Sequence, residues 1–136
     1  MAVKAKELRY AIALTAEGEL TEEHGVVLEA PPDWSAEHLL LAALLRCSLE
    51  SLRHHAKRQG IGVRSAAGTG RTLVTRRDTD ERYALVATEV ELFVELEPEP
   101  DPLADLLAPA ERDCFIGSSL TAKPNYRWTV NGRAVA

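Results

Sequence analysis

Cysteine, methionine and aromatic residues are all scarce in this 136-residue sequence, which holds two cysteines, one methionine and 5% aromatic residues. Two cysteines form at most one disulfide, and the chain is long enough to bury a core without such staples. In a reducing compartment, two thiols are more typical of catalysis, redox activity or simple burial than of a permanent bridge. Cys47 and Cys114 are therefore the first candidates for chemistry.

Basic residues are fewer than acidic ones, 16 against 21, and the net charge is −5. This balance argues against a phosphate-binding surface, so we expect no nucleic-acid partner. Long apolar runs are missing too: no stretch reaches the roughly 18 uncharged residues that a membrane helix needs, and Arg46 interrupts the best candidate. The N-terminal segment MAVKAKELRYAIAL lacks the core of an export signal. The sequence predicts one cytoplasmic domain over residues 1–136, with no membrane partner.

Short strands are predicted in the first third of the chain. Apolar Leu8, Tyr10, Ile12 and Leu14 alternate with other residues, which is the period of a half-buried strand. Residues 26–28 are three apolar residues after a glycine and predict a second short strand.

A long helix is predicted from Ser35 to Gly60. The Ser35 hydroxyl can cap its first turn, Glu37 suits the positive end of the helix dipole, and Gly60 is a natural C-cap. Residues 39–45 are apolar on every side, which predicts burial all round. Such burial is unusual in a chain of this size, so we expect a second subunit to help cover the helix.

An antiparallel pair of strands is predicted over residues 69–77 and 83–97, joined by a polar turn. The second strand alternates, with Phe93 and glutamates on its wet face. The residues predicted to face the other way are Val86, Thr88, Val90, Leu92, Val94 and Leu96. The Gly68-Thr69-Gly70 segment lacks the rest of a phosphate-loop pattern, and we interpret it as a bulge or strand entry.

Two short helices and a last strand are predicted near the C-terminus. One helix lies around residues 103–107 and is broken by Pro109. The next spans residues 114–120, and a strand over residues 126–130 ends in an Asn-Gly turn. The order of strands, long helix, strands, helices and strand predicts an α+β fold rather than a βαβ alternation.

The segment PPDWSAEHLLLAALLRC, with ERDCFIGSSL placing a second cysteine 67 residues after the first, resembles the OsmC/Ohr family of thiol-dependent hydroperoxide reductases. The resemblance covers about the full chain. It implies an α+β fold in which antiparallel sheets wrap around a long central helix, and an intertwined homodimer with active sites at the subunit interface. It also implies no bound metal and no organic cofactor, only an external thiol reductant.

Three residues take roles from this resemblance. Cys47 matches the peroxidatic thiol, Cys114 the resolving thiol, and Glu37 the carboxylate ten residues before the first cysteine. The implied function is a peroxidase that reduces organic hydroperoxides in oxidative-stress defence. The sequence departs from the family twice: residues 15–19 hold no arginine where the peroxidases usually carry one, and Phe-Ile-Gly follows Cys114 instead of Pro-x-Ser.

The chemistry requires a thiolate, because a neutral thiol attacks an O–O bond poorly. Burial in an apolar helix favours the neutral thiol, so a cation must lie near Cys47. The candidates are Arg46, Arg9 and Arg64, none of which belongs to a motif. After the attack Cys47 becomes a sulfenic acid, Cys114 condenses with it to a disulfide, and a thiol reductant restores both.

Each assignment has a plainer alternative. A cysteine in a helix is often a core residue, and Glu37 is also an ordinary first-turn partner of the helix dipole. Ten residues of straight helix measure ~15 Å, so Glu37 and Cys47 serve one site only if the helix breaks or if Glu37 reaches the cysteine of another subunit, and we expect the second arrangement. His54 and His55 follow Cys47 too distantly for a typical zinc site. The rival function is a non-peroxidatic protein of the same fold that binds a small apolar molecule or senses redox state.

Overall fold

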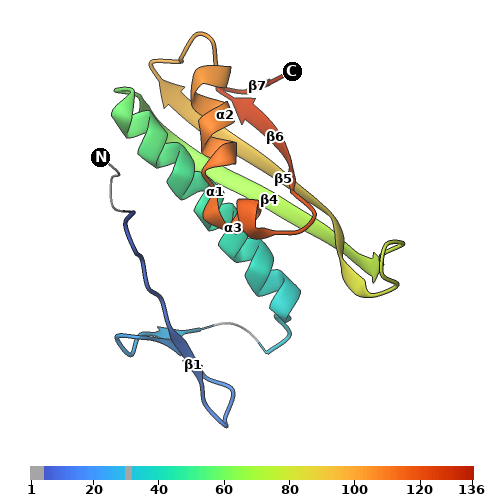
Figure 1. The fold of residues 1–136 in the computed structure, drawn as a ribbon. Helices are drawn as coiled ribbons and strands as arrows, with labels where there is room; N and C mark the ends of the chain where they lie inside the picture. The colour runs from blue at the N-terminus through green and yellow to red at the C-terminus, as the bar shows by residue number, and fades with distance from the viewer. Residues whose placement is uncertain (1–4, 30–31) are drawn as a thin grey trace. The chain divides into compact units, whose positions relative to one another are not determined.

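The computed structural model describes residues 5–29 and 32–136 (Figure 1). The chain divides into two compact units, residues 1–34 and residues 35–136. Among the described residues, no helix is both long enough and apolar enough to cross a membrane.

The smaller unit is an antiparallel sheet of three short strands, β1 (Ile12–Leu14), β2 (Leu20–Glu22) and β3 (Val27–Leu28). The two strands predicted here are confirmed in part, since the first starts at Ile12 rather than Leu8 and the second holds two residues. The β2 strand was not predicted, because three residues are too few to show an alternation.

Within the described residues 5–29, no large apolar side chain is buried. The exposed ones are Leu8, Tyr10, Ile12, Leu14, Val26, Val27 and Leu28. Three short strands need a further layer over their apolar face to be stable in water. The prediction of one domain over residues 1–136 stays a prediction.

Helix α1 (Ala36–Arg58) dominates the larger unit and is unbroken. Its N-cap is Ser35, as predicted, and a histidine at position 38 completes a capping box that usually uses glutamate or glutamine. Gly60 follows the end of the helix at φ +73°, a conformation that favours glycine. The predicted burial of residues 39–45 on every side is wrong for this chain by itself: Leu44 is fully buried, but Ala42 and Ala43 are exposed.

The larger sheet has the order β4 (Gly62–Arg76), β5 (Tyr83–Glu97), β6 (Asn125–Val130) and β7 (Arg133–Ala134). The second predicted strand is confirmed at both ends, and its alternation holds from Thr88 to Leu96. Asn131 and Gly132 both have positive φ in the turn between β6 and β7, as the Asn-Gly signal predicts.

Two helices, α2 (Ala104–Arg112) and α3 (Phe115–Ser119), connect β5 to β6. Because β6 runs parallel to β5, this connection is a crossover within an otherwise antiparallel sheet. The predicted break at Pro109 is wrong, since α2 continues through it. A proline removes one amide donor, and the buried side chains on either side of it outweigh that loss; these are Leu106, Leu107 and Ala110.

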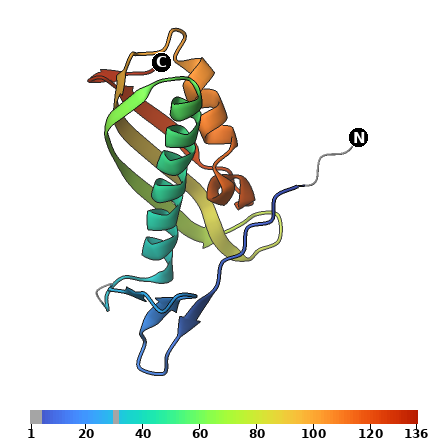
Figure 2. The same ribbon diagram turned by 90° about the vertical axis from the view of Figure 1, so that its left-hand side faces the viewer.

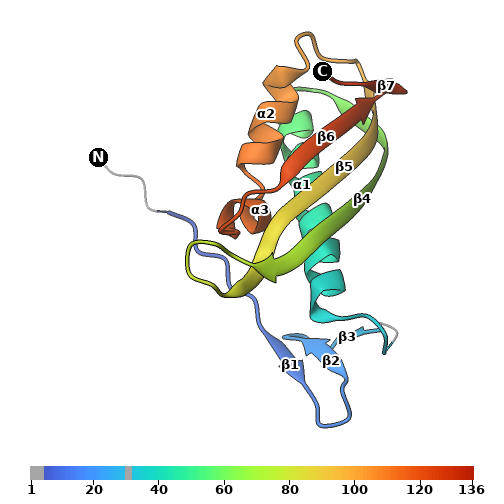
Figure 3. The same ribbon diagram turned by 90° about the vertical axis from the view of Figure 1, so that its right-hand side faces the viewer.

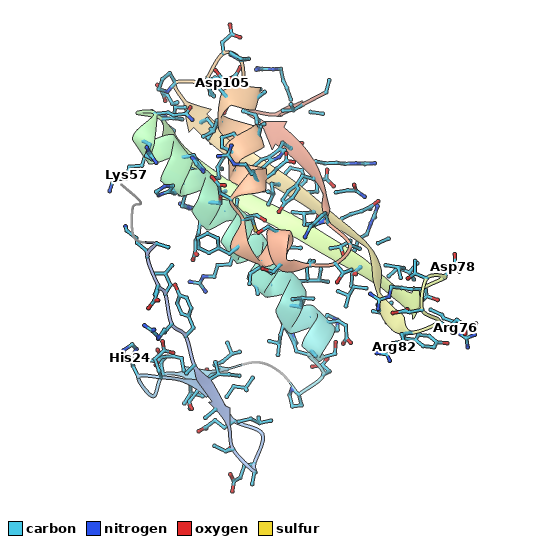
Figure 4. All side chains as sticks on the ribbon, viewed as in Figure 1. His24, Lys57, Arg76, Asp78, Arg82 and Asp105 are labelled. Atoms are coloured by element: carbon cyan, nitrogen blue, oxygen red, sulfur yellow. The ribbon has the colours of Figure 1, made fainter. Side chains whose placement is uncertain are left out.

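The α+β fold predicted from the element order is confirmed as a two-layer arrangement, with the helices on one face of the larger sheet (Figures 2 and 3). The core lies between the layers and includes Leu44, Leu52, Val90, Leu92, Leu106 and Val130. The hairpin between β4 and β5 carries charged side chains at its tip, among them Arg76, Asp78 and Arg82 (Figure 4).

Gly68 and Gly70 mark the place where α1 packs closely against β4. A Cβ atom on Gly68 would lie 2.8 Å from Leu92 Cδ2 and 3.0 Å from the Glu91 carbonyl oxygen. A Cβ atom on Gly70 would lie 3.5 Å from its nearest neighbour, which is an ordinary contact. The Gly-Thr-Gly segment therefore lies inside the strand and lets the helix approach it.

We expect Gly68→Ala to lower the free energy of unfolding by about 1–3 kcal/mol, because the added methyl group overpacks the layer between α1 and β4. Gly70→Ala is the matched control, since it adds the same methyl group where space exists. Urea unfolding followed by circular dichroism measures both variants. Equal stability of the two would contradict the packing argument.

Candidate functional site

The fold brings Cys47 and Cys114 together from two different helices of the larger unit. Cys47 lies near the middle of α1, and Cys114 is the N-cap residue of α3, which packs on α1. Both cysteines are free thiols, and they lie close enough for each to influence the pKa of the other. The sequence spacing of 67 residues thus becomes a side-chain contact.

Cys114 is completely buried and lies among hydrogen-bond donors. Its Sγ atom is 3.4 Å from Ser48 Oγ and accepts a hydrogen bond from the Gly117 amide at 3.4 Å. The Tyr126 hydroxyl also interacts with it. Burial raises the pKa of Cys114, but the interactions with Ser48, Gly117, Tyr126 and Cys47 outweigh burial and lower the pKa below that of an ordinary thiol.

Cys47 is only half-buried and differs from Cys114 in its ionisation. Burial is the main cause that raises its pKa, and the interaction with Cys114 adds to the rise. The backbone at Ile116 and Phe115 has the opposite effect, but it does not cancel the rise. Of the two thiols, Cys114 therefore ionises more easily, while Cys47 is the more accessible.

Cys47 opens onto a pocket of about 370 Å³ that runs along α1. The pocket is lined by Cys47, Glu50, Ser51, His54, His55, Asp113 and Phe115. At one end His55 Nε2 lies 2.8 Å from Asp113 Oδ2. Hydrogen bonds from Arg112, and then from His55, hold the pKa of Asp113 down at about 2, so this carboxylate is charged at neutral pH.

Two of the three predicted arginines, Arg46 and Arg64, belong to the larger unit and do not line this pocket, and Arg9 belongs to the smaller unit. Arg46 pairs with Glu50 at 3.6 Å, Arg9 with Glu7 at 2.8 Å, and Arg64 with Glu97. The pocket-lining residues include no lysine and no arginine in the part of the chain that the structure describes. Among these described lining residues, no arginine or lysine supplies the cation expected near Cys47.

Glu37 lies in the first turn of α1, far along the helix from Cys47, and it is exposed. Its own amide and the Ser35 side chain lower its pKa by hydrogen bonding. Because α1 is unbroken, Glu37 and Cys47 lie ~15 Å apart along the helix, as ten residues of straight helix require. These contacts agree with the first-turn interpretation of Glu37, and a catalytic role at the cysteine of another subunit stays a prediction.

The sequence interpretation missed Ser48 and Tyr126. Ser48 Oγ is 3.2 Å from the Tyr126 hydroxyl, and Ser48 is only 1% exposed. The signal for Ser48 was present, because a serine next to Cys47 lies just after the most apolar part of the helix. Tyr126 gave no such signal, since it alternates with Trp128 and Val130 like any strand residue.

Several solved structures resemble this fold at low sequence identity. An OsmC-like protein of unknown function from Vibrio cholerae aligns with a TM-score of 0.75 and 14% identity, over 90% of this chain and 100% of that chain. An OsmC-like protein from Mycoplasma pneumoniae gives 0.70 and 15%, over 93% and 99%. An organic hydroperoxide resistance protein from Elizabethkingia anophelis gives 0.64 and 17%, over 93% and 98%.

No curated protein matches this sequence. The family described as OsmC-like protein matches residues 30–129, which include both cysteines and the whole of helix α1. The match spans well over half of the chain and agrees with the structural neighbours. The chain belongs to the OsmC-like protein family.

Proposed function

We propose that this protein is a thiol-dependent peroxidase that reduces organic hydroperoxides through Cys47 and Cys114. One observation carries the proposal: two free thiols, distant in sequence, interact beside a pocket of about 370 Å³. Neighbouring folds that include organic hydroperoxide resistance proteins support the same class of reaction. The reducing cytoplasm would supply the thiol reductant that the cycle needs.

Access assigns the first step to Cys47, because it lines the pocket and Cys114 is fully buried. The Cys47 thiolate attacks the terminal peroxide oxygen. A sulfur–oxygen bond forms, the O–O bond breaks, and the alkoxide leaves and takes up a proton as an alcohol. Cys47 is then a sulfenic acid. Cys114 attacks its sulfur, the disulfide forms, and hydroxide leaves as water after protonation.

Ionisation of the two thiols is coupled, so the pair rather than either residue holds the first negative charge. The donors around Cys114 favour the charge there. Transfer of the Cys47 proton to the Cys114 sulfur would produce the attacking thiolate without a cation in the pocket. The closeness of the two thiols, each of which influences the pKa of the other, supports this transfer.

The working form is proposed to be a homodimer. The small N-terminal sheet exposes its apolar side chains, and the first half of α1 carries exposed Ala42 and Ala43 beside half-buried leucines. β4 is a long strand at the edge of the larger sheet. A second copy would cover such surfaces, and it is the only arrangement in which Glu37 could act at a cysteine.

The test uses the reduced wild-type protein and one equivalent of cumene hydroperoxide. We expect one equivalent of cumyl alcohol and a mass loss of two hydrogen atoms per chain, as a Cys47–Cys114 disulfide forms. With excess dithiothreitol, turnover should continue. No alcohol and no disulfide would contradict the proposal.

A second candidate function is supported by the pocket itself. The raised pKa of Cys47 and the absence of lysine and arginine from the described lining residues favour a protein that binds a small molecule or senses redox state without turnover. In the same experiment this candidate gives a disulfide but no sustained consumption of peroxide, or neither.

A further inference from the structure

Polar groups from three elements surround the buried Cys114 sulfur. Ser48 comes from α1, the Gly117 amide from α3 and the Tyr126 hydroxyl from β6. None of these groups lines the pocket that Cys47 faces. These groups therefore do not contact a substrate in that pocket, and their contacts converge on the sulfur of Cys114.

The hydroxyl hydrogens around Cys114 have one consistent arrangement when its sulfur is charged. A thiolate can only accept hydrogen bonds, so Ser48 must donate to it at 3.4 Å. Ser48 has a single hydrogen, and its oxygen is then free to accept from Tyr126 at 3.2 Å. Donors that point at an anion in a buried place stabilise it more strongly than neutral hydrogen bonds would.

We propose that Ser48 and the Gly117 amide form a leaving-group site for Cys114, with Tyr126 positioning Ser48, and that this site speeds the reduction of the Cys47–Cys114 disulfide. The inference rests on the proposed function, because that function forms the disulfide. The pKa of Cys114 is lowered although burial raises it, which agrees with a site that stabilises the Cys114 thiolate.

Reduction would proceed in two exchanges with an external dithiol. One thiolate of the dithiol attacks the Cys47 sulfur, which the pocket exposes. A new sulfur–sulfur bond forms, the Cys47–Cys114 bond breaks, and its electron pair leaves on Cys114 as a thiolate. The second thiol of the reductant then displaces Cys47. A leaving thiol with a lower pKa leaves faster, so stabilisation of Cys114 accelerates the first exchange.

The experiment forms the disulfide with diamide, an oxidant other than a peroxide, and then measures its reduction by excess dithiothreitol through the release of free thiols. We expect Ser48→Ala to slow this reduction about tenfold, since a hydrogen bond to a charged group is lost. Tyr126→Phe should slow it in the same direction by a smaller factor. The Tyr126→Phe variant also tests the proposal if Ser48→Ala folds poorly.

Thiolate absorbance at 240 nm, titrated in a Cys47→Ser background, provides the second measurement. Ser48→Ala should raise the pKa of Cys114 by about one unit. The titratable groups that face Cys114 are Cys47 from α1 and Tyr126 from β6, while neighbouring Asp113 is turned to His55 and Arg112. A merely structural change would not move this pKa.

Thr88→Val is the control, because it removes a buried hydroxyl that bonds to Thr72 and not to the cysteines. It should leave both the reduction rate and the titration unchanged. Wild-type rates and pKa in both Ser48→Ala and Tyr126→Phe would overturn the proposal, and so would a failure of diamide to form the disulfide. Slowed reduction in a protein that does not turn over cumene hydroperoxide would contradict only the peroxidase function.

Discussion

The Cys47→Ser variant is expected to reduce cumene hydroperoxide about a thousandfold more slowly than the wild-type protein, because a hydroxyl cannot replace the attacking thiolate. Cys47 is the thiol that lines the pocket, and buried Cys114 has no direct access to a substrate there. The measurement is peroxide consumption in the presence of excess dithiothreitol.

The Cys114→Ser variant is the matched partner of this experiment. It should consume one equivalent of peroxide and then stop when no reductant is present, with a sulfenic acid on Cys47 that dimedone traps and mass spectrometry detects. Because the interaction with Cys114 raises the pKa of Cys47, its removal should also make Cys47 easier to ionise. If Cys47→Ser kept the first round and Cys114→Ser lost it, the two roles would have to be exchanged.

The Leu92→Ala variant is expected to lose about 2–5 kcal/mol of its free energy of unfolding, the usual cost of a cavity at a buried leucine. Leu92 is fully buried on the face of β5 that packs on the helices, and it lies against Gly68 of β4. Its side chain thus fills the layer between the central strand and α1. Urea denaturation gives the free energy directly.

Phe93→Ala is its control, since Phe93 is the next residue along β5 and points to the opposite face. Phe93 is 39% exposed, so its truncation should cost less than the truncation of Leu92. A larger loss for Phe93→Ala would mean that the outer face of the sheet is covered by another chain.

The sequence predicted those helices and strands whose formation depends on short-range patterns, such as an alternation of apolar residues or a helix cap. The strand over residues 83–97 follows an alternation that one buried face requires, and α1 starts at the serine whose hydroxyl caps it. β4 begins at Gly62, earlier than predicted, because its first half is built from small residues that leave room for the helix. Small residues show no alternation of apolar and polar side chains. The small side chains that let α1 approach β4 therefore also remove the pattern from which a strand is predicted.

The structural features that the sequence did not predict depend on contacts between segments that are distant in the sequence. The parallel pairing of β5 with β6 leaves no local pattern, and α2 passes through Pro109 because packing decides its course. In the site, the resemblance supplied the cysteine pair, whereas the hydroxyl contact between Ser48 and Tyr126 joins positions 78 residues apart. No spacing rule connects a helix serine to a strand tyrosine.

The crossover that carries Cys114 has a thermodynamic consequence for the whole chain. A disulfide from Cys47 would close a loop of 67 residues that contains β4, β5 and α2. In the chain-entropy description, a loop of that length restricts the unfolded ensemble by about 4 kcal/mol. Reduction would release the restriction and broaden the unfolded ensemble again. The oxidation state of one cysteine pair would thereby set how strongly the larger unit resists unfolding.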